Sequence, residues 1–220
     1  MSTSPTVYCI GRNYAEHAQE LNNPVPDEPV IFLKSPVCIT ALQGKIELPA
    51  DCGRLDYETE IYILLKKDIW RGAETDIHSC VSGYGVALDL TLRDKQDQLK
   101  QKKHPWTMAK NFIHACPISP ITPLGKDVNL QELSFGLRVN GQIKQEGNTR
   151  DMLFPILDLI NYISHRIPLR KSDIILTGTP AGVGPIQHED ALEVFIESKV
   201  CARMIASMPK TSEEDEEELS

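Results

Sequence analysis

The sequence lacks long apolar runs, paired-cysteine motifs and paired-histidine motifs, and each absence excludes a class of protein. No apolar stretch approaches the ~20 residues that a membrane helix needs, so a membrane protein is not expected. The six cysteines are scattered without a CxxC pair, which favours reduced, buried thiols over a disulfide framework or a zinc site. The histidines show no HxxxH spacing, which argues against a soft or borderline metal.

The sequence also lacks a stripe of basic residues, and most of its excess negative charge lies in one short segment. The formal net charge is −8, but six of the negative charges lie at residues 213–218. Subtracting them leaves −2 for the rest of the chain, and nothing there would follow a phosphate backbone, so nucleic acid is not an expected partner. We expect residues 209–220 to form a disordered, solvated tail, with an interaction role as the less favoured alternative.

The remaining composition is that of an ordinary globular domain. At 220 residues, 41% hydrophobic and 25% charged, the chain suits one compact domain over residues 1–208. The opening segment MSTSPTVYCIGRNY has neither the basic flank nor the long apolar stretch of a secretory signal. We therefore expect a cytoplasmic location, with an organelle matrix as the alternative.

Short strand-like runs separated by turns dominate the chain, and helices are few. Strands are expected at residues 6–10, 30–34, 58–65, 84–92, 173–177 and 191–197. A hairpin is expected about Asn140-Gly141, because alternating segments flank a dipeptide that fits a two-residue turn. Helices are expected at residues 14–21, 93–103 and 152–165, with Pro155 tolerated in the first turn of the last one. Helices that do not alternate with strands favour an α+β fold.

A proline-rich segment follows the first expected helix. Residues 22–29 read NNPVPDEP, which cannot sustain a helix or a central strand and should form a surface loop. Helix and loop together, at about residues 12–29, are expected to act as a lid.

Three carboxylates carry the strongest chemical signal. Residues two apart on a strand share a face, so Glu58 and Glu60 should project side by side, although a solvated acidic face is the commoner reason for such a pair. Asp89 alters that balance, because it interrupts the apolar run GVALDLTL, where an unpaired buried carboxylate is costly. Oxygen ligands alone suit a hard ion, Mg²⁺ or Mn²⁺, that keeps positions open for water and substrate.

Several segments, taken together, resemble the fumarylacetoacetate hydrolase family, and more closely its small single-domain acylpyruvase and oxaloacetate decarboxylase branch. In chain order they are CIGRNYAEHAQEL, EPVIFLKSP, the strand with Glu58 and Glu60, GYGVALDLTLRDKQ, PWTMAKNF, LRVNGQIKQEGNT and DIILTGTPAGVGP. The resemblance covers nearly the whole chain, although most segments are weak signals singly. It implies a mixed β-roll with short flanking helices, a homodimer, and Glu58, Glu60 and Asp89 as the metal ligands.

The resemblance also assigns a lid pair. His17 and Glu20 lie three residues apart and share a face of the first helix, where a carboxylate can orient an imidazole and raise its basicity. Spacing alone favours an exposed polar face. In similar family members such a pair is the general acid or base, so the resemblance implies that role here.

Four further residues are implied to bind substrate. On its own, Lys110 would be interpreted as a surface lysine whose aliphatic stem packs against the protein. The resemblance implies instead that Lys110, with Arg93 and Gln96, contacts the substrate carboxylate and the oxyanion. Thr179 lies in the turn GTPAGVG. Its hydroxyl and the backbone N–H groups of the turn could bind the same carboxylate, although the need for tight turns explains the glycines nearly as well.

One departure from the family is visible. Members often carry two histidines just before the first glutamate, where this chain has Asp56 and Tyr57. The ligands themselves are intact, so the change bears on the polarity beside the metal and on the preferred substrate.

The resemblance and the intact pair of His17 and Glu20 imply cleavage of a 2,4-dioxo acid to pyruvate and a carboxylate. A 2-oxo acid can chelate the ion through its carboxylate and carbonyl. Oxaloacetate decarboxylation and keto–enol tautomerisation are open at the same site. The alternative is isomerisation of hydroxymuconate-type diene-dioates in aromatic catabolism. A non-catalytic metal-binding scaffold that works through its acidic tail is a distant alternative.

Overall fold

The computed structural model describes residues 4–20, 24–72 and 74–208. Its helices are α1 (Ala15–Glu20), α2 (Ile77–Cys80), α3 (Arg93–Gln101), α4 (Thr107–Lys110) and α5 (Ile156–Ser164), with 3-10 turns η1 (Pro36–Cys38) and η2 (Thr149–Asp151). None of the described helices is long and apolar enough to cross a membrane. The predicted acidic tail, 209–220, lies outside the described residues.

Within the described ranges the strands form three sheets. The largest has the order β2-β1-β13-β6-β7-β9-β3, with β10 paired to β7. Its strands are β1 (Val7–Gly11), β2 (Val30–Lys34), β3 (Ile39–Ala41), β6 (Thr59–Leu65), β7 (Val81–Leu88), β9 (Cys116–Ile118), β10 (Thr122–Pro123) and β13 (Ile174–Leu176). Parallel β1–β13 and β3–β9 pairs stand beside antiparallel ones, which makes the sheet mixed.

A second sheet has the order β12-β11-β15-β16-β4, and a small third one the order β14-β5-β8. The strands of the second sheet are β4 (Gln43–Glu47), β11 (Ser134–Val139), β12 (Gln142–Asn148), β15 (Ala191–Ile196) and β16 (Lys199–Ser207). Those of the third are β5 (Leu55–Tyr57), β8 (Thr91–Leu92) and β14 (Gly184–Pro185). Short helices around mixed sheets confirm the predicted α+β class.

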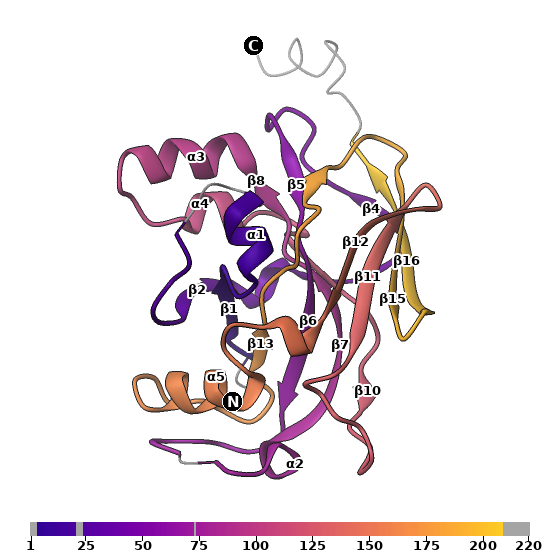
Figure 1. Ribbon diagram of the computed structural model, residues 1–220. Coiled ribbons are helices and arrows are strands. Elements are labelled where there is room, and N and C mark those ends of the chain that lie inside the picture. The colour runs from indigo at the N-terminus through magenta and orange to yellow at the C-terminus, as the bar shows by residue number, and fades with distance from the viewer. Residues whose placement is uncertain (1–3, 21–23, 73, 209–220) are drawn as a thin grey trace.

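The main core lies between the two larger sheets. Buried residues of one cluster come from β6 and β7 of the large sheet and from β11 and β15 of the second: Ile61, Ile63, Val86, Leu88, Phe135, Leu137, Leu192 and Val194. Figure 1 shows β11, β12, β15 and β16 on one side of the molecule, while α1, α3 and α4 gather on the other side near β8. Alternation along β6 sends Tyr62 to a second buried cluster on the opposite face of the sheet.

The predicted elements are present, with two corrections. The hairpin forms between β11 and β12, and both Asn140 (φ 51°) and Gly141 (φ 77°) take the left-handed conformation that its turn requires. The last predicted helix begins at Ile156 rather than Met152, because Pro155 disfavours helical backbone in the residue before it and serves as the N-cap. The predicted strand at 84–92 is interrupted at Asp89 and Leu90, which separate β7 from β8.

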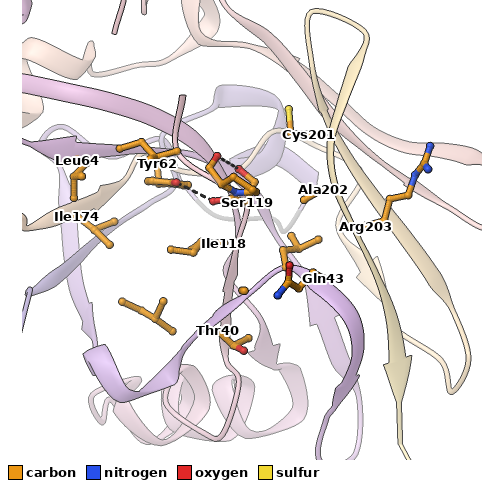
Figure 2. A pocket seen from close by; sticks show the side chains of 15 residues that line it. Thr40, Gln43, Tyr62, Leu64, Ile118, Ser119, Ile174, Cys201, Ala202 and Arg203 are labelled. Carbon is orange, nitrogen blue, oxygen red and sulfur yellow. Dashed lines mark hydrogen bonds between the residues drawn. The ribbon is translucent and has the colours of Figure 1, made fainter. Parts of the chain in front are cut away.

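A large groove of about 580 Å³ lies on the outer surface, where β3 and β16 approach the outer face of β6. Figure 2 shows its lining, which includes Tyr62, Leu64, Ile118 and Ala202, with the hydroxyl of Tyr62 turned inward to donate to the backbone oxygen of Ser119 at 2.9 Å. No carboxylate or imidazole lines this groove. The chemistry of the described chain is concentrated elsewhere.

Candidate metal centre and active site

Strand pairing brings the three carboxylates together. In the antiparallel β6–β7 pair Thr59 lies opposite Leu88, and just beyond it the backbone N–H of Asp89 donates to the carbonyl of Glu58 at 2.8 Å. Opposed residues and residues two apart share a face of a sheet. Glu58, Asp89 and Glu60 therefore project to the same side.

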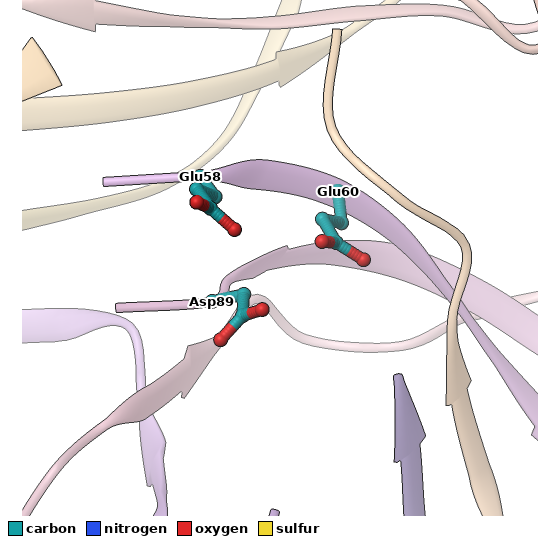
Figure 3. Close-up of side chains that lie close together, drawn as sticks. All are labelled: Glu58, Glu60 and Asp89. Atoms are coloured by element: carbon teal, nitrogen blue, oxygen red, sulfur yellow. The ribbon is translucent and has the colours of Figure 1, made fainter. Parts of the chain in front are cut away.

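The carboxylates converge in space as this register requires. One oxygen each of Glu58, Glu60 and Asp89 lies within 4.8 Å of the others, and all three side chains are buried. Figure 3 shows them side by side, with Glu58 just before β6, Glu60 in β6 and Asp89 in the segment after β7. The predicted cluster thus exists as a compact group of hard oxygen atoms.

Two buried lysines neutralise part of this charge. Lys110, from α4, places its Nζ 2.8 Å from Glu58 Oε2 and 2.7 Å from Asp89 Oδ2, and also donates to the hydroxyl of Thr91 at 2.7 Å. Lys34, at the end of β2, places its Nζ 2.8 Å from Asp89 Oδ1. The apolar surroundings of Asp89 are therefore offset by two ammonium groups.

Arg93 forms the next layer of the cluster. Its Nη2 donates to Glu58 Oε1 at 2.6 Å, its Nε to Asp56 Oδ2 at 2.7 Å, and its Nη1 to Gln96 Oε1 at 2.7 Å. Asp56 also accepts from Arg54 Nε at 2.7 Å. Since a guanidinium group only donates, the carbonyl oxygen of Gln96 must face Arg93, which leaves the amide NH₂ of Gln96 free to donate.

The two glutamates differ in their electrostatics. Burial alone would raise the pKa of Glu58, but the nearby charges of Lys110 and Arg93 outweigh it and leave the pKa below its ordinary value. Burial and the neighbouring Asp89 raise the pKa of Glu60 well above its ordinary value, against the lowering effect of a hydrogen bond from the Gly178 N–H at 2.7 Å. Glu60 makes no ion pair with any cationic side chain of the described ranges.

This arrangement fits a hard divalent cation. One oxygen of each of the three carboxyl groups lies within reach of one ion, and Glu60 is a buried carboxyl group that lacks a cationic partner in the described chain. An ion beside Glu60 would remove the repulsion that raises its pKa. Oxygen ligands without nitrogen or sulfur are those that Mg²⁺ and Mn²⁺ prefer.

The lid pair is also assembled. On α1 the Nδ1 atom of His17 lies 3.3 Å from Glu20 Oε2, and the Glu20 carboxylate accepts the Gly182 N–H at 3.1 Å. An ionised carboxylate only accepts, so Nδ1 is the donor in this pair and Nε2 of a neutral His17 keeps its lone pair. His17 is buried rather than exposed, contrary to what spacing alone favours.

Gln145 fixes the hydroxyl of Thr179. Its Oε1 accepts the Thr59 N–H at 2.9 Å, and its Nε2 donates to Thr179 Oγ1 at 2.8 Å and to the Pro180 carbonyl at 2.9 Å. The backbone N–H can only donate and the carbonyl can only accept, so the orientation of the Gln145 amide is determined. The hydroxyl proton of Thr179 is consequently free for another acceptor.

One small cavity of about 30 Å³ unites most of these groups. Its lining includes His17, Glu58, Glu60, Arg93, Gln96, Lys110 and Thr179, together with Arg12, Lys100 and Trp106. The volume suffices for about one water molecule, so a 2-oxo acid can enter only if part of the wall moves. Helix α1, which belongs to the predicted lid, forms part of that wall through His17.

The chain matches the family described as fumarylacetoacetate (FAA) hydrolase C-terminal over residues 6–205. The chain belongs to the fumarylacetoacetate hydrolase family. Relatives within it include "Oxaloacetate tautomerase FAHD1, mitochondrial" of Mus musculus, 41% identical with 90% of this chain and 89% of that protein covered. "Oxaloacetate tautomerase YcgM" of Escherichia coli (strain K12) is 40% identical, with 86% of each chain covered.

Solved structures agree with this family assignment. A fumarylpyruvate hydrolase from Pseudomonas aeruginosa, in complex with Mn²⁺ and pyruvate, has a TM-score of 0.87 and 27% identity, covering 93% of this chain and 90% of that one. A 5-carboxymethyl-2-hydroxymuconate delta-isomerase from Mycobacterium smegmatis has a TM-score of 0.81 and 30% identity, covering 94% and 80%. These family members are named as enzymes, and the prediction of an enzyme with the family's fold is confirmed.

The structure places all nine predicted site residues in or beside one region of this family fold. Eight of them line the small cavity or belong to the carboxylate cluster, and Glu20 contacts Nδ1 of His17. Their assigned roles remain predictions, as do the domain limits and the cytoplasmic location. Lys34, Gln145 and the pairing of Asp56 with Arg93 were not predicted from the sequence. Isolated polar residues in EPVIFLKSP and LRVNGQIKQEGNT were the available signal.

We predict that Asp56→Ala lowers the free energy of unfolding by about 3 kcal/mol, because it removes a partner from the buried Arg93. Asp68→Ala is the matched control. Asp68 pairs with Arg170 at 3.0 Å on the surface, and little change is expected there. Urea denaturation of the two variants measures the difference, and equal small losses would contradict the structural role given to Asp56.

Proposed function

We propose that the chain is a divalent-metal-dependent enzyme that interconverts the enol and keto forms of a short 2-oxo acid, with oxaloacetate as the substrate. The observation that carries the proposal is the cluster of Glu58, Glu60 and Asp89, within 4.8 Å, beside the cavity-lining His17. The names of the mouse and Escherichia coli relatives, at 41% and 40% identity, support oxaloacetate.

Glu58, Glu60 and Asp89 would hold the ion, which when bound would accept the carboxylate and the adjacent carbonyl of the substrate and favour negative charge on that carbonyl oxygen. Mn²⁺ in the fumarylpyruvate hydrolase from Pseudomonas aeruginosa supports such an ion. Mg²⁺ or Mn²⁺ would serve equally, since both take oxygen ligands.

His17 would move the proton. With Nδ1 donating to Glu20, its Nε2 lone pair can take a proton from the enol oxygen or from C3 and return it to the other position. Glu20 is itself anchored on the Gly182 N–H, so the imidazole is held in one orientation. Tautomerisation needs only this proton transfer, with no bond between heavy atoms broken.

Two neutral donors would orient the substrate. The Gln96 amide NH₂ and the Thr179 hydroxyl both line the cavity, and both have their acceptor atoms engaged by Arg93 and Gln145 respectively. Their free hydrogens suit the oxygens of a carboxylate. Lys110 already donates to three partners, so its contribution would be mainly its positive charge.

Cleavage of acylpyruvates is the second candidate. The fumarylpyruvate hydrolase similarity favours it, and the same His17 could deprotonate a water that attacks the C4 carbonyl, giving a carboxylate and pyruvate. Isomerisation of hydroxymuconate-type acids has a counterpart in the Mycobacterium smegmatis neighbour. Tautomerisation ranks first because more closely similar relatives carry that name.

We predict that the protein binds one Mn²⁺ per chain and that Glu60→Gln weakens this binding at least ~100-fold, as measured by isothermal titration calorimetry. Because Glu60 has no cationic partner in the described chain, the same variant should keep or raise the unfolding temperature of the metal-free protein. Glu146→Gln, on the exposed side of β12, is the control. Unchanged Mn²⁺ affinity in Glu60→Gln would refute this metal site.

We predict that His17→Gln lowers the turnover of oxaloacetate enol to keto form by about 10²–10⁴-fold while Mn²⁺ binding stays intact, because the proton carrier is removed. Proton NMR with and without a chelator follows both forms, and acetylpyruvate in a parallel sample reports hydrolysis through released pyruvate. Glu16→Gln, exposed on the same helix, should keep wild-type rates. Turnover that survives chelation would end the metal-dependent account.

We also propose that two copies of the chain associate through the face formed by η1, α4 and the segment after α4. Val37, Ile113 and Met108 are 85%, 66% and 64% exposed there, and Asn111 ties the two segments through bonds to Ser35 N at 2.5 Å and Thr107 O at 3.0 Å. Exposed apolar side chains gathered on one face are typical of an interface.

Light scattering coupled to size exclusion tests this association. The wild type is expected at twice the mass of one chain, and the double variant V37S/I113S at the mass of one. Ile121→Ser, in the groove of Figure 2, is the control and should leave the mass unchanged. A dimer that Ile121→Ser dissociates and the double variant does not would place the interface elsewhere.

A further inference from the structure

Two cationic side chains line the small cavity without a role in the carboxylate cluster. Arg12, in the turn after β1, and Lys100, in the last turn of α3, belong to the same wall as His17 and Trp106. The cluster cations are already matched, because Lys34, Lys110 and Arg93 each contact a buried carboxylate. Arg12 and Lys100 are the remaining positive charges of the cavity wall.

Their own partners are weak or missing in the described residues. Lys100 lies 3.7 Å from Asp97, whose side chain is more than half exposed, and stands over the Trp106 ring at 5.8 Å. Arg12 makes no ion pair with a described residue. Two positive side chains that line one small cavity repel each other, and an anion between them would be attracted to both.

The two groups lie in one electrostatic environment. Burial lowers the pKa of Lys100, Asp97 raises it, Arg93 lowers it, Glu58 raises it and Arg12 lowers it, with a net lowering. Lys100 is therefore close enough to both guanidinium groups to feel their charge. An anion between Arg12 and Lys100 would relieve this repulsion.

The backbone conformation at Arg12 is fixed by its neighbours. Arg12 has φ 59°, an uncommon conformation for a residue other than glycine. The next residue, Asn13, is fully buried and locks the turn by donating to Thr177 O at 2.8 Å and accepting the Phe154 N–H at 2.8 Å. Strained residues that the surroundings hold in place cluster at ligand sites.

We propose that Arg12 and Lys100 form a second anion subsite of this cavity, which binds the distal carboxylate of the substrate and so selects 2-oxo dicarboxylates over 2-oxo monocarboxylates. The subsite rests on the proposed function, because the other end of the substrate must be held at the carboxylate cluster. Arg12 supplies a planar pair of donors that matches a carboxylate, and Lys100 supplies a point charge.

A matched ligand pair tests the subsite by isothermal titration calorimetry with Mn²⁺ present. 2-Oxoglutarate and 2-oxopentanoate have equal carbon chains and differ in the distal carboxylate, while oxalate has no distal group at all. The wild type should bind the dicarboxylate at least tenfold more tightly than the monocarboxylate. Arg12→Gln and Lys100→Gln should each lose most of that preference and keep oxalate affinity within twofold. Lys102→Gln, exposed just beyond α3, should behave as wild type.

Oxaloacetate turnover provides the second readout. Each subsite variant should raise KM about tenfold and leave kcat within twofold, because the distal contact is the same in the ground and transition states. Wild type that binds oxalate but shows no dicarboxylate preference, or variants that keep the preference, would overturn the subsite alone. Wild type that fails to bind oxalate with Mn²⁺ would overturn the proposed function and the subsite together.

Discussion

The antiparallel register between β6 and β7 is the constraint on which the rest of the site depends. It sets Asp89 opposite Glu58, with Glu60 two residues further on the same face. A slip of one residue would turn Glu58 and Glu60 into the core between the sheets and Ile61 onto the site. Packing of Ile61 and Ile63 against the second sheet therefore holds the carboxylates in place.

Burying this much charge requires compensation, and the chain supplies it from distant segments. Lys34 comes from β2, Lys110 from α4 and Arg93 from α3, so three separate elements converge on two strands. Breaking such buried pairs is far more costly than breaking exposed ones. Glu60 is the exception that lacks a cation in the described chain, which leaves its charge for an ion that the three carboxylates would share.

The sequence predicted features that depend on local pattern. The hairpin at Asn140-Gly141, the strand Val30–Lys34 and the pair of glutamates follow from short-range rules of turn and strand geometry. Residues such as Lys34 and Gln145 could not be predicted, because their partners lie 34 or more positions away. A four-residue helix such as α4 is too short to leave a periodic signal.

The family resemblance supplied roles where pattern alone was ambiguous, and the structure then explained the one visible departure. Asp56 stands where members often carry a histidine, and it pairs with both Arg54 and Arg93. The local polarity beside the cluster is thus set by an ion-paired carboxylate. That arrangement holds Arg93 against Glu58 and directs Gln96 toward the cavity.

The most direct test of the central claim is anomalous diffraction from a crystal grown with Mn²⁺ and oxalate. Our account predicts one anomalous peak bonded at about 2.1 Å to an oxygen of each of Glu58, Glu60 and Asp89, with oxalate completing its coordination. A peak at another place, or a Lys110 ammonium between Glu58 and Asp89 with no peak beside Glu60, would contradict it.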